Sequence, residues 1–165
     1  MGYVENNLMQ GERICLSARV HWIIFSKAAI FFTAALLLLL FSLKISLGGD
    51  TEFASSVRYA GLFALLASLW SLGGGLINRL STELAVTSKR VIVKFGFIRR
   101  STIELNHSKV ESFHVHQGLF GRIFGYGTLH INGTGGGMTP IQNIADPLGF
   151  RRKAMEAIDA SQSNY

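Results

Sequence analysis

Two uncharged stretches near the start of the chain constrain its fold more than any other feature. Residues 28–43 contain no charged side chain, and residues 59–77 form a second uncharged stretch that is rich in leucine. About 20 helical residues are enough to span the roughly 30 Å hydrocarbon core of a bilayer. A soluble chain of 165 residues has too little protein to bury two helices that are apolar on every face. We therefore predict a membrane protein with two transmembrane helices, at about residues 24–46 and 58–77.

The placement of Lys and Arg predicts the orientation of this hairpin. Cations flank the two stretches on the side of the chain termini: Arg13, Arg19 and Lys27, then Arg79, Lys89, Arg90, Lys94, Arg99 and Arg100. The connection over residues 44–58 carries Lys44 and Arg58 alongside Asp50 and Glu52. Because Lys and Arg accumulate on the cytoplasmic side, we expect both termini in the cytoplasm and the connection outside. The single cysteine, Cys15, permits no internal disulfide, which suits a reducing compartment.

Small residues recur along the second stretch at intervals of three and four, which places them on one face of a helix. They are Gly61, Ala64, Ser68, Ser71 and Gly75. The first stretch carries small residues seven apart, at Ala28, Ala35 and Ser42. In a bilayer, close backbone approach at small residues supplies helix packing. This helix-packing seam predicts either an antiparallel hairpin or a homo-oligomer contact, and the spacing is compatible with both.

After Arg79 the apolar period changes to two, which is typical of strands. The predicted strands cover residues 82–87, 90–98, 99–105, 109–117, 127–132 and 138–143, and a glycine-rich hairpin loop occupies 133–137. In the second of these, Val91 and Val93 alternate with Arg90 and Lys94. This alternation predicts a strand with one buried and one exposed face.

The N-terminal flank also alternates. Apolar residues from Ile14 to Trp22 interleave with polar ones such as Arg19 and His21. This pattern predicts a strand that pairs with the edge of the sheet. The alternative is a segment that lies along the lipid headgroups.

A C-terminal helix is predicted to close the fold. Asp146 is its expected N-cap, Pro147 its first residue and residue 160 its approximate end. The predicted fold class is an α+β membrane protein, in which a two-helix transmembrane hairpin precedes a β-barrel or sandwich of six or seven strands capped by this helix. The expected parts are an N-terminal cytoplasmic segment (1–21), the transmembrane hairpin (22–78), a cytoplasmic domain (79–160) and a tail (161–165).

The sequence lacks recognisable catalytic or cofactor motifs. His114 and His116 share one face of a strand, but no Cys, Asp or Glu stands at a spacing that would complete a metal site. The glycines over residues 133–137 lack the Lys-Ser/Thr of a phosphate-binding loop. We therefore expect no metal, no cofactor and no enzyme activity. The glycines over 118–127 predict a tight crossover between strands, with an inward-packing set: Leu119, Phe120, Ile123 and Phe124.

Cations of the C-terminal part form the best candidate binding surface. Residues 79–165 contain eleven Lys and Arg against six Asp and Glu, a balance of +5. The residues predicted to contact anionic lipid are Lys89, Arg90, Lys94, Arg99 and Arg100. Each cation near an anionic leaflet contributes about 1 kcal/mol. The alternative is that these cations only set topology and solubility. Nucleic acid is not an expected partner, because no basic segment interleaves exposed aromatic residues.

Several short motifs resemble one known family. They are residues 87–92 (TSKRVI), 109–111 (KVE), 117–129 (QGLFGRIFGYGTL), 11–14 (GERI) and 21–22 (HW). In these motifs the chain resembles the bacterial pleckstrin-homology-like (PH-like) family, in its membrane-flanked, YdbS-like form. The resemblance implies a helix-capped β-barrel without catalytic activity, on the cytoplasmic face of the bacterial inner (plasma) membrane.

Together these features predict a non-catalytic binding or scaffold module. The expected protein is multi-pass and presents a PH-like domain at the inner leaflet. The domain would bind anionic membrane lipid or a protein partner there. The alternative is a structural subunit of a larger membrane assembly, built through the small-residue seam.

Overall fold

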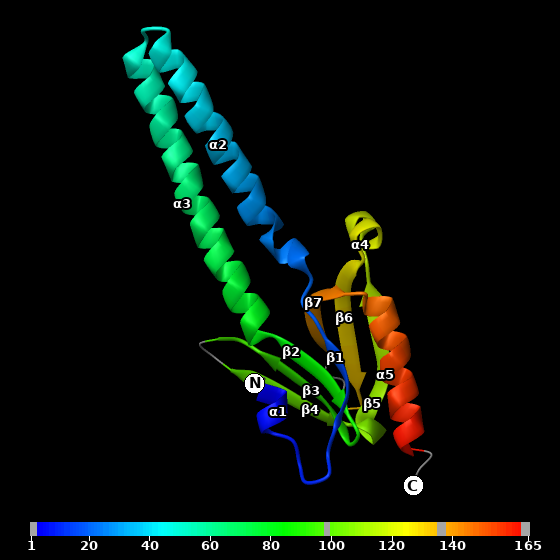
Figure 1. Ribbon diagram of the computed structural model, residues 1–165. Coiled ribbons are helices and arrows are strands. Elements are labelled where there is room, and N and C mark those ends of the chain that lie inside the picture. The colour runs from blue at the N-terminus through cyan, green and yellow to red at the C-terminus, as the bar shows by residue number, and fades with distance from the viewer. Residues whose placement is uncertain (1–2, 98–99, 135–137, 163–165) are drawn as a thin grey trace. The chain divides into compact units, whose positions relative to one another are not determined.

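The computed structural model describes residues 3–97, 100–134 and 138–162 of the chain (Figure 1). These residues fall into two compact units. Met1–His21 and Asn78–Tyr165 together form one, which we call the β unit, and Trp22–Ile77 form the other, the helical hairpin. The N-terminal segment, predicted as a separate part, therefore belongs to the same unit as the C-terminal strands.

The helical hairpin contains two long apolar helices. A short 3-10 helix, η1 (Trp22–Phe25), leads into α2 (Ser26–Leu47), and α3 (Thr51–Ser81) follows. Both helices are long and apolar enough to cross a membrane. The connection turns at Gly49, whose φ of 97° is costly for residues with a Cβ. Asp50 then caps α3, because its Oδ1 accepts a hydrogen bond from Phe53 N at 3.1 Å.

Among the described residues of the β unit, seven antiparallel strands make up two sheets. The first has the order β1 (Ile14–Ala18), β2 (Glu83–Thr87), β3 (Arg90–Phe95), β4 (Ser101–Asn106). The second has the order β5 (Val110–His116), β6 (Tyr126–Gly133), β7 (Met138–Ala145). β1 occupies the edge position that the alternating N-terminal sequence predicts.

The prediction of a closed barrel is wrong, and the alternative of two sheets is the observed architecture. A 3-10 helix, η2 (His107–Lys109), interrupts the chain between β4 and β5. On the other side of the unit, a single bridge between Val20 and Ile144 joins the segment after β1 to β7. The described strands therefore pair within two sheets of four and three.

One face of each sheet contributes to a shared core, together with α5 (Pro147–Gln162). α5 packs against β1, β5 and β6 (Figure 1). Its predicted N-cap is present, because Asp146 Oδ1 accepts a hydrogen bond from Gly149 N at 3.1 Å. The side chains that α5 turns inward are Phe150, Ala154, Ala157 and Ile158. Residues 163–165 of the predicted tail lie outside the described residues.

The other face of the four-stranded sheet is also covered, contrary to the prediction of an exposed face. A four-residue helix, α1 (Tyr3–Asn6), lies over it. Val4 and Leu8 pack on Ala85 and Ile92, and Ile92 is fully buried. The N-terminal segment thus supplies both an edge strand and a cover for the sheet.

Candidate functional site

Arg90, predicted as a lipid contact, is buried in a network of polar side chains. Its Nε and Nη2 donate hydrogen bonds to the two carboxylate oxygens of Glu12, at 3.1 and 3.0 Å. Its Nη1 donates to Glu104, and Nη2 also donates to the carbonyl of Asn7 at 2.9 Å. Thr87 Oγ1 donates to Glu12 at 2.6 Å. The side chain of Arg90 is 8% exposed and that of Glu12 is not exposed at all.

Hydrogen bonds hold this network in its ionised form. Burial acts to raise the pKa of Glu12, but hydrogen bonds from Met9 N, Thr87 and Arg90, with the charge of Arg90, bring the pKa below its usual 4.5. The hydrogen bond that Arg90 donates to Glu12 leads the causes that raise the pKa of Arg90, in spite of burial. Removing one partner of a buried, hydrogen-bonded ion pair destabilises the folded state, so this pair has a structural role. The position is therefore not an open headgroup site.

Sequence reasoning missed the acidic partners of Arg90. The available signal was that a cation on a strand face needs a counter-charge if that face is covered. Glu104 is paired with Ile92 across β3 and β4, which places it beside Arg90. Glu12 lies 78 residues away in sequence, and only the fold brings it close.

The predicted cations lie at two opposite ends of the four-stranded sheet. Lys94 of β3 pairs with Glu83, the first residue of β2, so the end of β3 and the start of β4 lie beside the start of β2. We call this the entry end, because the chain arrives there from α3 and β1 ends there before His21. Lys89 lies in the β2–β3 turn, roughly 15 Å away along five strand residues.

The two lysines of the predicted set contact other parts of the β unit. Lys89 is exposed, and its Nζ donates to the carbonyl of Gln10 at 3.1 Å. Lys94 is 13% exposed at its side chain and pairs with Glu83 at 3.3 Å. The same Glu83 carboxylate accepts hydrogen bonds from Tyr3 N and Val4 N, at the start of α1. Lys94 therefore helps to hold α1 in place.

Two arginines, Arg99 and Arg100, follow β3 in the sequence. Arg100 is exposed at the entry end. Arg99 lies outside the described residues. Of the five predicted lipid contacts, Arg100 and Lys89 are the described members with exposed side chains, and they lie at opposite ends of the sheet.

The glycine-rich segment between β5 and β6 forms a helix that the sequence did not predict, α4 (Leu119–Phe124). The prediction that its apolar side chains pack inward is wrong. Leu119, Phe120 and Ile123 are 78%, 69% and 74% exposed, and Phe124 is 46% exposed. The backbone of Gly121 faces inward instead, so close to β6 that a Cβ there would lie 2.5 Å from the carbonyl oxygen of Tyr126.

Three contacts fix α4 in this orientation. Gln117 Nε2 donates to the carbonyls of Gly121 and Tyr126, at 3.3 and 2.9 Å. Gly125 ends the helix with a φ of 73°, in the left-handed region that glycine favours. The carbonyl of Gly125 also accepts a hydrogen bond from Asp146 N at 2.8 Å, at the start of α5. The outward direction of the apolar side chains is therefore a consequence of the fold around them.

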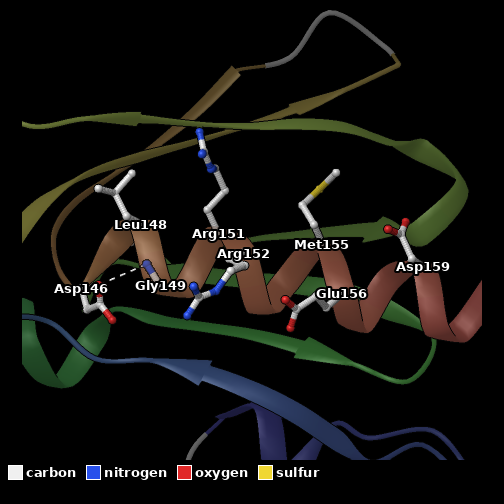
Figure 2. A pocket seen from close by; sticks show the side chains of 8 residues that line it. All are labelled: Asp146, Leu148, Gly149, Arg151, Arg152, Met155, Glu156 and Asp159. Carbon is white, nitrogen blue, oxygen red and sulfur yellow. Dashed lines mark hydrogen bonds between the residues drawn. The ribbon is translucent and has the colours of Figure 1, made fainter.

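A wide hollow of about 750 Å³ lies along the outer side of α5. Figure 2 shows Arg151 and Met155 extending to one side of the helix and Arg152 and Glu156 to the other. Two arginines share the hollow with three carboxylates, those of Asp146, Glu156 and Asp159. This balance of charge does not favour an anionic ligand. Asp146 is already engaged as the helix cap.

The predicted histidine pair forms no recognisable metal centre. His114 Nε2 lies 3.2 Å from Ser112 Oγ on the same strand. Over residues 3–97, 100–134 and 138–162, no three His, Cys, Asp or Glu side chains are grouped as metal ligands would be. Another histidine, His107, is buried; its Nδ1 is hydrogen-bonded to Ser161 Oγ, and burial lowers its pKa.

The small residues of the hairpin lie at contacts between α3 and α2, or the segment before α2, within one chain. Ser68 Oγ donates to the carbonyl of Ala28 at 2.9 Å, and Ser42 Oγ to that of Ala54 at 2.8 Å. A Cβ on Gly61 would lie 3.0 Å from Leu39. Gly75 is similarly close to Phe25. Ala64 and Ser71, the other predicted members, are half-buried. These contacts run antiparallel along α2 and α3.

Replacing Ser68 by leucine should weaken the hairpin by about 1 kcal/mol, the scale of single contacts between transmembrane helices. Ser68 is 5% exposed, so a larger side chain must push the helices apart. Leu69 is 58% exposed, and Leu69→Ile is the matched control. Unfolding in mixed micelles, followed by fluorescence of Trp22 and Trp70, measures both. Equal stability of the two variants would show that the seam does not hold the hairpin.

Comparison with known proteins identifies one family. The sequence model described as Bacterial PH domain matches residues 28–161, which include most of α2, all of α3 and the strands β2 to β7. No curated protein and no solved structure matches the chain significantly. The match agrees with the resemblance drawn from the short motifs. Two of those motifs, 11–14 and 87–92, contribute Glu12, Thr87 and Arg90 to the buried network.

Proposed function

The chain belongs to the bacterial PH domain family, and from this premise we propose that it is an integral membrane protein that presents a PH-like unit as a non-catalytic binding module. The module serves anionic lipid or a protein partner at the cytoplasmic face of the bacterial inner membrane. PH domains generally bind lipids or proteins and do not catalyse reactions.

The exposure of the two long helices carries this proposal. Only 11% of the residues in the most apolar part of the first helix are buried, and 17% in the second. A core helix of a soluble protein would be mostly buried. The exposed side chains include Phe63 and Trp70, at 75% and 87%. Apolar surface of this extent favours lipid as its surroundings.

Charge supports the proposed orientation. The N-terminal and C-terminal segments belong to one unit, the β unit, which supports placing both on the same side of the membrane. That side has the excess of Lys and Arg, which favours the cytoplasm. Among the five predicted lipid contacts, we retain Arg100 at the entry end, with Arg99 next to it in sequence. Arg90 and Lys94 serve the fold instead.

The alternative, a structural subunit built through the small-residue seam, has less support. The seam residues Gly61, Ser68 and Gly75 already contact α2 of the same chain or the segment before it. A second chain could not use the same face without opening the hairpin. We therefore favour a binding module over an assembly subunit.

Labelling with a membrane-impermeant thiol reagent tests the proposal. In intact cells, Asp50→Cys in a Cys15→Ser background should react, because the turn between α2 and α3 lies outside. The natural Cys15, exposed on β1, should react only after the membrane is permeabilised. Reaction of Cys15 in intact cells would overturn the orientation. Release of the protein from membranes by alkaline extraction would overturn the integral membrane assignment.

A further inference from the structure

α4 inverts the usual arrangement of a short helix on a sheet. Its glycine backbone is pressed against β6, and its large apolar side chains point to solvent. Gln117, Gly125 and the start of α5 hold it in this orientation. Exposed phenylalanine, leucine and isoleucine on one rigid element indicate a contact surface.

The position of α4 in the β unit indicates what covers it. Tyr126, the first residue of β6, stacks on His21 with ring centroids 5.5 Å apart. His21 N donates to the carbonyl of Asn143 at 2.6 Å, and Ala145 N donates to that of Arg19 at 2.9 Å. α4 therefore lies at the end of the unit where the chain leaves at His21. The next residue, Trp22, begins the first apolar segment.

Further exposed apolar side chains lie at the entry end of the four-stranded sheet and near the start of α5. Phe97 of the β3–β4 turn is 64% exposed, and Leu148, near the start of α5, is 51% exposed. Cations accompany them, because Arg122 of α4 and Arg100 are exposed. The segment over residues 117–128 contains no Asp or Glu. Apolar and aromatic side chains mixed with cations suit the boundary between acyl chains and anionic headgroups.

We propose that α4 is a second membrane contact, in which Leu119, Phe120 and Ile123 insert into the headgroup–acyl boundary of the leaflet where the first apolar helix begins. This contact rests on the proposed membrane function. It fixes the tilt of the β unit, because the contact through α4 adds to the two chain connections with the hairpin, after His21 and before Asn78. It also leaves the opposite end of the sheets, with the Glu12–Arg90 network, facing away from the leaflet.

Quenching by brominated lipid tests the contact. The full-length protein carries Phe120→Trp in a Trp22→Phe, Trp70→Phe background and is reconstituted into phosphatidylcholine–phosphatidylglycerol liposomes with brominated acyl chains. The tryptophan at position 120 should lose most of its emission and shift to the blue. Met9→Trp in the same background is the matched control, because Met9 is 54% exposed and bonds to Glu12 at the opposite end. Its emission should not change.

A third protein, which keeps only Trp70, separates the two proposals. Trp70 lies on the hairpin and should be quenched in every case. Quenching of Trp70 without quenching at position 120 overturns the α4 contact alone. No quenching of Trp70 overturns the membrane function and the α4 contact with it. Adding Ile123→Asp to Phe120→Trp should restore emission, whereas Ile123→Leu should not. If emission at position 120 depends on the protein-to-lipid ratio instead, a second copy covers α4 and the lipid contact is overturned.

Discussion

Replacing Arg90 by methionine is expected to destabilise the β unit by about 3–5 kcal/mol, the cost of leaving one member of a buried ion pair alone. The carboxylate of Glu12 has no exposed area, and Arg90 supplies two of its hydrogen bonds. Hydrogen exchange of the amides of β2 and β3, measured on the full-length protein in micelles, reports this loss. Exchange should accelerate by roughly two to four orders of magnitude.

Two further variants show whether charge is the cause. Combining Arg90→Met with Glu12→Leu removes both charges and should recover most of the loss, because apolar replacements of a buried pair are often neutral. Lys89→Met removes a neighbouring exposed cation and should change stability by less than about 0.5 kcal/mol. Equal exchange rates in Arg90→Met and Lys89→Met would contradict a structural role for the network.

The same network has a pH signature in the natural protein. The pKa of Glu12 is lower in the folded state than its usual 4.5, so the folded protein binds fewer protons there than the unfolded chain. Its contribution to stability is therefore complete above pH 4.5 and is lost as the pH falls through the folded-state pKa. Glu12→Gln should remove this part of the acid sensitivity, once exchange rates are corrected for their intrinsic pH dependence.

The sequence predicts well those elements whose pattern is local. The two apolar helices, the strands with a period of two and the capped C-terminal helix are each indicated by a residue pattern within about 20 residues of the element. The predicted membership of the bacterial PH family is confirmed. No such pattern indicates that α1 covers the outer face of the four-stranded sheet. This helix is only four residues long, and it packs on strands some 80 residues later in the sequence. Without that cover, Arg90 appears as an exposed cation.

The orientation of α4 is a second feature that the local sequence does not determine. Leu119, Phe120 and Ile123 fit the spacing of an apolar helix face, and such faces normally point inward. The contrary signal is Gly121, whose missing side chain permits close contact between the helix backbone and a neighbouring strand. A helix with glycine on one side and apolar residues on the other can be turned either way. The choice depends on β6 and α5, which the local sequence does not specify.

Replacing Gly121 by alanine is expected to cost about 1–3 kcal/mol, because the added methyl group overfills a closed contact. Its Cβ would lie 2.5 Å from the carbonyl oxygen of Tyr126, a backbone atom that cannot move without distorting β6. α4 must then shift away from the sheet, and the hydrogen bonds from Gln117 to Gly121 and Tyr126 must lengthen. Hydrogen exchange over residues 117–128 should accelerate by roughly ten- to a hundredfold.

Gly118→Ala is the matched control, three residues earlier. A Cβ at Gly118 would meet no atom within 4 Å, and its φ of −73° is ordinary for alanine. This variant should leave exchange near the natural rate. Similar acceleration in both variants would mean that α4 is not seated on Tyr126 through Gly121. Its apolar side chains would then lack a fixed outward direction, and the membrane contact proposed for Leu119, Phe120 and Ile123 would lose its structural basis.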